Sequence, residues 1–364
     1  MGEEERYSCL GWQLLLPGQA RRLQDLFAAF GSARAAFTAS VADLAPVLGR
    51  RQAEELVKRR EMLDVEGEIK KLKQAGARFV TLADDGYPAL LRKTFDPPAA
   101  LFYHGELPAE EPAVAVVGTR RCSSYGQLVA ERLGRELAEA GVTVVSGLAR
   151  GIDTAAHRGA LAGGGRTVAV LGTGLDICYP AVNRRLMKEI AAKGAVVSEF
   201  PLGMFAEPWH FPVRNRIIAG LSRAVVVVEA KERSGALITA DLALEQGREV
   251  MAVPGNITSP FSRGPNSLLK QGAHPVTDAV DVLEAIGLKG LFSKETQGKP
   301  VLDQLEASLL SLLSGEPLSQ EALIQRAGAP ASKVLSGLVF LELKGLVRSL
   351  PGGLYTVGKP VSGG

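Results

Sequence analysis

Residues 142–157 read VTVVSGLARGIDTAAH, which combines an apolar strand-like run, a glycine-spaced turn and the beginning of a helix. Gly147 and Gly151 flank Arg150 in the turn. Glycines let the backbone come close to a ligand, and a helix N-terminus presents free N–H groups, so the turn is typical of an anion-binding site. We expect the helix to begin at Asp153, whose carboxylate would cap the first free N–H groups.

The same order of strand, turn and helix recurs along the chain from residue 113. Helical stretches lie between the apolar runs, and the helix expected over 127–140 carries Val129, Leu133 and Leu137 on one face. Strands that are apolar throughout and alternate with helices predict a parallel sheet covered on both faces, a doubly wound Rossmann-like α/β core. The runs cover residues 113–117, 142–145, 167–171, 195–197, 224–228 and 250–253.

The two ends of the chain have different patterns. In residues 1–75 apolar side chains recur at three- and four-residue intervals, which predicts a small helical module of the SAM or helix-hairpin type. Residues 76–288 form the expected core, in which the short strand-like pieces of 76–111 bridge the module to the sheet. A polar linker over 289–302 precedes residues 303–358, where three helices and a hairpin predict a winged-helix domain.

Composition and charge exclude several classes of protein. Hydrophobic residues make up 46% of the 364 and charged residues 22%, as in a soluble globular protein. The apolar runs fall far short of the ~18 residues that span a membrane, and the acidic start does not resemble a signal peptide, so we expect a cytoplasmic protein without membrane contact. Three cysteines without CxxC spacing and four scattered histidines predict neither disulfides nor a metal site.

Several glycine- and arginine-bearing turns follow the predicted strands. In open α/β sheets ligands bind beyond the carboxyl ends of the strands, which places VGTRR (117–121), SGLARG (146–151) and GTGLDICYP (172–180) on one rim. FPVRNR (211–216) reaches the same rim if the loop before it folds back. The chain contains neither a GxGxxG fingerprint followed by an acidic residue nor GxxxxGK[ST], so the expected anion site is not an obvious ATP or NAD site.

Seven motifs occur in one order through this region, namely VGTRR, SGLARGIDTAAH, GTGLDICYP, SEFPLG, FPVRNRIIAGLS, SGALITADLALEQGREV and VPGNITSPFSRGPNSLLKQGA. Together they resemble the DNA-processing protein A family, DprA/Smf, over about residues 75–287. The resemblance implies a non-catalytic protein without a cofactor that binds single-stranded DNA. It further implies a homodimer formed through the Rossmann-like core, protection of incoming DNA, and loading of the RecA recombinase in natural transformation.

Residue types on the predicted rim suit such a ligand. Single-stranded DNA is held by a basic groove and by flat side chains that stack on bases, and guanidinium groups match phosphate oxygens. With no catalytic or metal-binding residue among them, the expected DNA contacts are Gly118, Thr119, Arg120, Arg121, Ser146, Gly147, Ala149, Arg150, Gly151, Gly172, Gly174, Phe211, Arg214, Asn215, Arg216, Ser234, Gly235 and Lys270.

Several of these residues and their neighbours also have a structural interpretation. Arg214 and Arg216 are also suited to ion pairs with Glu199, Glu207 or Glu229. Trp209 and Phe211 are equally interpreted as core residues under a long loop. His157 is more typical of packing than of a general base, and Cys122 has no evident catalytic partner.

Two further functions compete with the DNA-binding hypothesis. Related Rossmann-like nucleotide hydrolases of the lysine-decarboxylase-like group cleave an N-glycosidic bond and carry PGGxGTxxE, whereas this chain has VEAKERSGALITA after the fifth strand, with Glu229 as the candidate acid or base. The winged-helix pattern is also that of duplex readers. Its third helix offers only Lys333 and Lys344, without Arg, Asn or Gln for base edges, which favours a protein contact.

Overall fold

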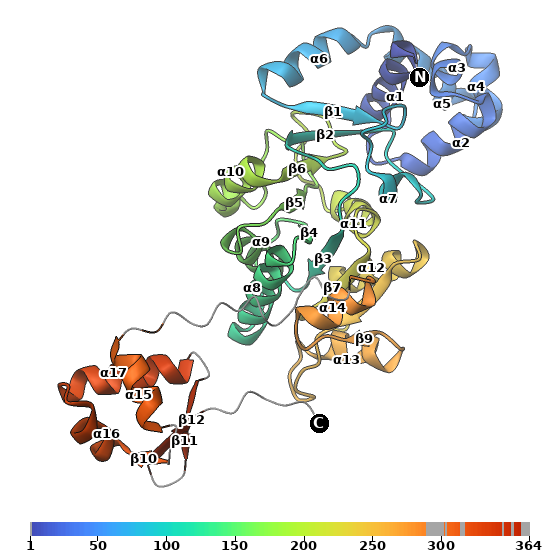
Figure 1. The fold of residues 1–364 in the computed structure, drawn as a ribbon. Coiled ribbons are helices and arrows are strands. Elements are labelled where there is room, and N and C mark those ends of the chain that lie inside the picture. Colours follow the sequence, from blue (N-terminus) through green and yellow to red (C-terminus); the bar gives the residue numbers. More distant parts are fainter. Residues whose placement is uncertain are drawn as a thin grey trace. The chain divides into compact units, whose positions relative to one another are not determined.

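The computed structural model describes residues 2–288, 302, 304–313, 317–343, 346–350 and 353–357. The chain divides into two compact units, Met1–Leu291 and Phe292–Gly364 (Figure 1). Most of the linker expected over 289–302 lies outside the described residues. Among the helices that are described, none combines the length and the apolar character needed to cross a membrane.

A nine-stranded sheet with the order β1-β2-β6-β5-β4-β3-β7-β8-β9 forms the centre of the first unit. The strands from β3 to β9 pair in parallel, which confirms the predicted doubly wound core. They are β3 (Ala113–Val117), β4 (Thr143–Ser146), β5 (Thr167–Val170), β6 (Ala195–Ser198), β7 (Ala224–Val227), β8 (Glu249–Ala252) and β9 (His274–Pro275).

Residues 78–105 extend the sheet, and the strand-like pieces expected over 76–111 are two of its strands. β1 (Arg78–Thr81) pairs antiparallel with β2 (Ala100–Gly105), and β2 pairs antiparallel with β6. Leu101 and Phe102 in β2 are buried. Pairing with β2 satisfies the backbone groups along β6, which would otherwise be an open edge.

Helices cover both faces of the sheet, as the right-handed crossovers require (Figure 1). One face carries α8 (Ser124–Glu139), α9 (Ile152–Ala162) and α10 (Arg184–Lys193). The other carries α11 (His210–Gly220) and α12 (Gly235–Glu245), with α13 (Arg263–Lys270) next along the chain. α14 (Ala279–Ala285) contacts α8.

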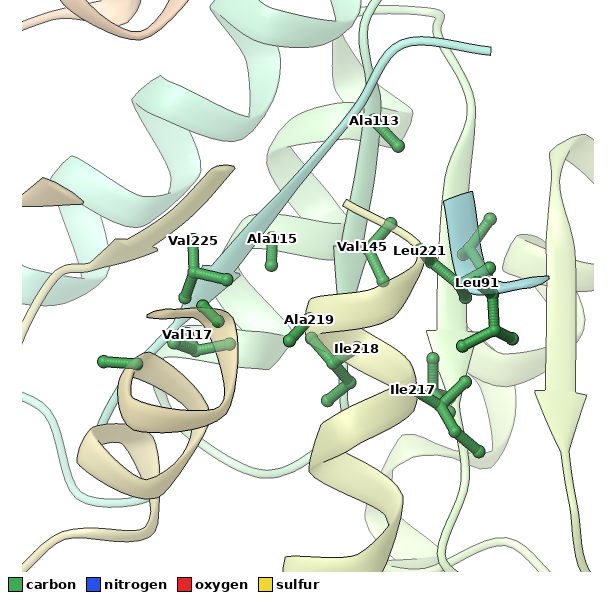
Figure 2. Packing of buried hydrophobic residues seen from close by; sticks show 14 of the residues in the cluster. Leu91, Ala113, Ala115, Val117, Val145, Ile217, Ile218, Ala219, Leu221 and Val225 are labelled. Carbon is green, nitrogen blue, oxygen red and sulfur yellow. The ribbon is translucent and has the colours of Figure 1, made fainter. Parts of the chain in front are cut away.

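The main core lies between the sheet and α11. Val117, Val145 and Val225 project from neighbouring strands toward Ile217 and Ile218 of α11 (Figure 2). All five side chains are almost fully buried. At ~25 cal/mol per Å² of apolar surface removed from water, side chains of this size each contribute about 1.5–3 kcal/mol to stability, so the core fixes α11 rigidly against the sheet.

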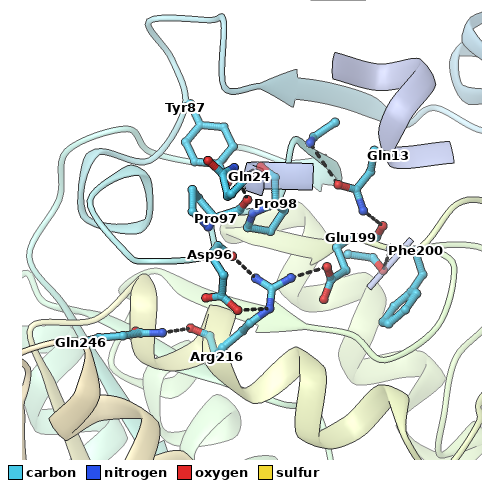
Figure 3. A network of polar contacts seen from close by, with 12 residues as sticks. Gln13, Gln24, Tyr87, Asp96, Pro97, Pro98, Glu199, Phe200, Arg216 and Gln246 are labelled. Atoms are coloured by element: carbon cyan, nitrogen blue, oxygen red, sulfur yellow. Dashed lines mark hydrogen bonds and ion pairs between the residues drawn. The ribbon is translucent and has the colours of Figure 1, made fainter. Parts of the chain in front are cut away.

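The N-terminal helices gather around Trp12 and pack onto the same unit. Leu10 and Leu72 join the apolar cluster that includes Phe102, and the Gln13 side chain donates to the Glu199 carbonyl at 2.9 Å (Figure 3). These helices are α1 (Glu3–Leu15), α2 (Ala20–Phe30), α3 (Ala33–Thr38), α4 (Val41–Leu48), α5 (Arg50–Glu61) and α6 (Val65–Gln74), and α7 (Ala89–Arg92) follows β1.

The second unit is the winged helix that the sequence predicts. Its elements are α15 (Gln304–Leu313), β10 (Leu318–Ser319), α16 (Gln320–Ala327), α17 (Ala331–Leu343), β11 (Val347–Leu350) and β12 (Leu354–Val357). The short strand β10, which we do not predict, pairs with β12 in a sheet of order β10-β12-β11. Lys344 and most of the predicted hairpin turn lie outside the described residues.

Candidate nucleic-acid interface

A groove of ≈ 890 Å³ opens beyond the carboxyl ends of β3 and β7. β3 is the strand from which the chain order diverges, with β4 on one side and β7 on the other. Loops leaving the two sides of such a switch point separate and leave a crevice. The predicted residues that line the groove are Gly118, Thr119, Arg120, Arg121, Ala149, Phe211, Arg214, Asn215, Ser234 and Gly235.

A ring and a guanidinium group lie together in the groove. The guanidinium carbon of Arg120 is 4.9 Å from the centre of the Phe211 ring, and the Tyr179 ring lies 5.4 Å from Phe211 at 41°. Arg120 is exposed, and Tyr179 is 47% exposed. Phe211 therefore lines the groove and is not the core residue of the alternative interpretation.

The loop after β7 adds cations that the sequence analysis missed. Lys231 and Arg233 are exposed and line the groove, and the Lys231 ammonium is 5.5 Å from the Phe261 ring. Tyr179 was missed as well. Their position in the sequence could have revealed Lys231, Arg233 and Tyr179, because all three follow strands whose carboxyl ends meet at this rim.

The SGLARG turn is built differently from the prediction. α9 begins at Ile152 and not at Asp153, and its N-cap is Gly151, which has a φ of 78°. The Asp153 carboxylate accepts from the N–H groups of Gly147 at 3.1 Å and Ala149 at 3.3 Å. Those two N–H groups are bound inside the protein, so the expectation that they bind phosphate is corrected.

Other predicted contacts lie outside the groove lining. Ser146 is buried and its hydroxyl donates to the Val116 carbonyl at 2.7 Å. Gly172 packs behind Phe211, and Gly174 packs against the Pro201 carbonyl. Arg150 and Lys270 are exposed, yet like Gly147 and Gly151 they are not part of the lining.

Arg214 forms part of the groove floor, and the protein itself binds several of its donors. It is 4% exposed, and its Nη1 donates to the carbonyls of Val170 and Gly147, the latter at 2.8 Å. Burial lowers the pKa of its guanidinium to about 10, against the opposing effect of Asp153. Arg214 thus supplies positive charge to the groove floor, whereas Arg120 and Arg121 supply exposed charge.

Arg216 is structural, and its expected DNA contact is corrected. Its guanidinium is bound by the buried Glu199 carboxylate and by Asp96, whose carboxylate is 3.5 Å from Nε (Figure 3). Burial raises the pKa of Glu199 to about 7, and Arg216 acts in the opposite direction. The ion pair with Glu199 that we considered is therefore the one that forms.

Glu229 secures the loop that carries Arg120. Its buried carboxylate accepts from the N–H of Ser123 at 2.9 Å and from the Ser123 hydroxyl at 2.5 Å. The Ser123 hydroxyl in turn accepts from the Gly126 N–H at 3.0 Å and so caps α8. Both oxygens of Glu229 are thereby committed to holding the loop between β3 and α8.

The chain is similar to proteins of one family. A family model described as DNA recombination-mediator protein A matches residues 78–287, and one described as DprA winged helix domain matches residues 293–353. Protein Smf of Escherichia coli is 42% identical over 298 residues, which cover 79% of this chain and 80% of that protein.

Solved structures agree with this likeness. The X-ray structure of DNA processing protein A from Streptococcus pneumoniae has a TM-score of 0.68 and 39% identity, covering 77% of this chain and 97% of that one. DNA processing protein A from Helicobacter pylori, whose structure is described for its single-stranded DNA binding mode, has a TM-score of 0.52 and 30% identity, covering 57% and 94%. The chain therefore belongs to the DNA recombination-mediator protein A family, DprA/Smf.

Proposed function

We propose that the groove beyond β3 and β7 binds single-stranded DNA and that the protein acts in DNA processing without catalysing a reaction. The observation that carries the proposal is the cluster of Arg120, Phe211 and Tyr179, in which the guanidinium group lies 4.9 Å from the Phe211 ring centre and the two rings are 5.4 Å apart. Exposed rings stack on unpaired bases, and the guanidinium group neutralises the adjoining phosphates. Lys231 and Arg233 face the same groove and extend its positive charge along the backbone of the strand.

The ring faces favour a single strand over a duplex. In a duplex the base faces are covered by their neighbours, so Phe211 and Tyr179 would find no surface on which to stack. The single-stranded DNA binding named for the Helicobacter pylori relative supports the same choice. The remaining Arg121, Asn215 and Ser234 line the groove as polar contacts to phosphate or sugar.

The groove residues do not favour a nucleotide hydrolase. A general acid or base must reach the substrate, whereas Glu229 is 3% exposed and binds Ser123 with both oxygens. A carboxylate held in this way positions the Arg120 loop. The proposed role of Glu229 is therefore structural.

Two wider roles follow from family membership. We propose that the protein forms a homodimer through its Rossmann-like core and loads RecA onto the bound strand during recombination or natural transformation. Both proposals rest on the matches to DNA recombination-mediator protein A and to DNA processing protein A.

Titration of fluorescent oligo-dT by anisotropy, over a series of salt concentrations, tests the groove. Arg120→Ala is expected to weaken binding about 10-fold, because one exposed charge and a stacking partner are lost, and to reduce the salt slope by about 1. Arg185→Ala is the matched control, since Arg185 is exposed on α10 and paired with Glu189. Equal affinities for the two variants, or binding that ignores salt, would contradict the proposal.

A further inference from the structure

A second hollow of ≈ 650 Å³ lies between the N-terminal helices and the core, beside the groove. Gly18, Arg21 and Arg22 line it from the N-terminal side, and Val213 lines it from α11. Pro212 and Ile238 line this hollow and the groove alike. The two hollows therefore share a wall, and an extended ligand leaving the groove passes over Pro212 into the second one.

A guanidinium group and a ring also lie together beside the second hollow, where Arg21 is a lining residue and Phe95 directly precedes the lining residue Asp96. The guanidinium carbon of Arg21 is 5.3 Å from the centre of the Phe95 ring, close to the 4.9 Å between Arg120 and Phe211. Phe95 is 74% exposed, so its ring offers a face to solvent. An exposed ring beside a guanidinium group is again suited to a base and its adjoining phosphate.

Arg21 and Arg22 of the lining form no ion pair among the described residues, whereas its third arginine, Arg216, is bound by Asp96 and Glu199. Asp96 lies in the lining, but its carboxylate is 3.5 Å from Nε of the buried Arg216. The remaining carboxylate of the lining is that of Asp25. Two guanidinium groups outside any ion pair of the described residues are suited to the oxygens of phosphate groups.

Hydrogen bonds hold the two sides of the hollow in place. Gln24 lies one helical turn after Arg21 on α2 and donates to the Pro97 carbonyl at 3.3 Å, next to Phe95 and Asp96 (Figure 3). Gln13 joins α1 to the core by accepting from the Ala100 N–H at 3.3 Å and donating to Glu199. Arg21 and Phe95 are therefore presented on a rigid support, which lowers the entropy lost on binding.

We infer that a single strand bound in the groove continues across Pro212 into the second hollow, where Arg21 and Arg22 contact phosphates and Phe95 stacks on a base. The N-terminal helices thus form part of the DNA-binding surface. This inference rests on the proposed function of the groove and extends the length of strand that one protein molecule engages.

Two lengths of oligo-dT distinguish binding in the groove from binding in the second hollow. An oligonucleotide of about six nucleotides fills the groove alone, and one of about twenty also reaches the second hollow. The double variant Arg21→Ala/Arg22→Ala is expected to bind the long oligonucleotide about 10-fold more weakly, with a salt slope lower by about 2, because two phosphate contacts are lost. Its affinity for the short oligonucleotide should equal that of the wild type. Phe95→Ala should weaken only the long oligonucleotide and leave the salt slope unchanged.

The matched control is Arg50→Ala/Arg51→Ala, which also removes two exposed charges from the N-terminal helices, but from α5. Thermal unfolding of each variant confirms that it is folded. An equal loss in the control, or an undiminished affinity of Arg21→Ala/Arg22→Ala for the long oligonucleotide, overturns the inference and leaves the groove intact. If the short oligonucleotide does not bind the wild type, the proposed function of the groove fails as well.

Discussion

Asp153 and Arg214 are buried side chains of opposite charge that influence each other electrostatically at the groove floor. Burial raises the pKa of Asp153, and the positive charge of Arg214 opposes that effect. Asp153 accepts from two N–H groups of the turn after β4, and Arg214 donates to carbonyls of the same turn and of β5. Isolated buried charges are costly, so these backbone hydrogen bonds stabilise both the two side chains and the turn that they bind.

His157 lies at the centre of the same region and has a defined tautomer. The Thr167 hydroxyl donates to the Val144 carbonyl at 2.6 Å, so it accepts from Nδ1–H of His157 at 2.7 Å. Burial, aided by the charge of Arg214, lowers the pKa of His157 to about 3. The side chain is therefore a neutral packing residue, in agreement with its structural interpretation.

A neutral buried histidine makes stability depend on pH. In the unfolded chain its pKa is about 6.5, so between pH 6.5 and 3 the unfolded state binds a proton that the folded state does not. The free energy of unfolding therefore keeps its full value with respect to His157 above pH 6.5. Below that pH it falls by roughly 1.4 kcal/mol for each pH unit, down to about pH 3. His157→Asn keeps a donor for Thr167 and should show a shallower fall of the unfolding free energy in urea titrations.

Other groups titrate in the same range, so the comparison needs a second histidine variant. His104→Asn changes a residue on β2 whose Nδ1 lies 3.1 Å from the carbonyl oxygen of Gly76. That variant should keep the slope of the wild type. A common slope for wild type and His157→Asn would show that the imidazole takes no part in the acid loss.

At the scale of the elements, the contact between α8 and α9 positions the loops after β3 and β4, which supply Arg120 and Ala149 to the groove. A Cβ atom on Gly134 of α8 would collide with the Ala156 carbonyl of α9, and one on Gly159 of α9 would collide with the Glu131 carbonyl of α8. The two helices therefore approach backbone to backbone. This close approach fixes where the loops after β3 and β4 enter their helices.

Gly159→Ala tests this contact. Alanine favours a helix by about 1 kcal/mol over glycine, so a surface position would be stabilised. Here overpacking dominates, and we expect a loss of roughly 2 kcal/mol in the unfolding free energy. Gly86→Ala, where a Cβ meets nothing within 4 Å, serves as the control and should change stability little. A stabilised Gly159→Ala protein would contradict the close packing of the helices.

At the scale of the whole molecule, the groove and the second hollow both belong to the first unit. The residues that line them fall between Gly18 and Phe261. The winged helix of the second unit has Val339 and Phe340 of α17 at 55% and 57% exposed. Apolar side chains on the helix that reads bases in transcription factors fit a protein contact better than a duplex.

Deletion of residues 289–364, which removes the winged helix, tests whether the first unit alone binds DNA. The truncated protein should bind oligo-dT within about 2-fold of the full chain and with the same salt slope, because every proposed phosphate contact is retained. The measurement is the same anisotropy titration, with duplex DNA as the comparison. A tenfold loss of affinity for oligo-dT would move part of the binding site into the winged helix.

The fold was predictable because its signals are local. Continuously apolar runs between helices predict β3 to β8, and three- and four-residue periodicity predicts the N-terminal helices. The antiparallel β1 and β2 were missed as members of the sheet, since a short strand does not reveal its partner. The glycine turns and Arg120 were found because position after a strand is itself a sequence property.

By itself the sequence determined the order of the elements, the rim on which the ligand turns meet and the family. Only the tertiary structure decided which arginine of a motif faces the ligand. Arg214 and Arg216 are two residues apart, yet one forms part of the groove floor and the other pairs with Glu199 and Asp96. The reason is physical: a side chain's role depends on burial and on charges brought close by folding, and neither is encoded in local spacing.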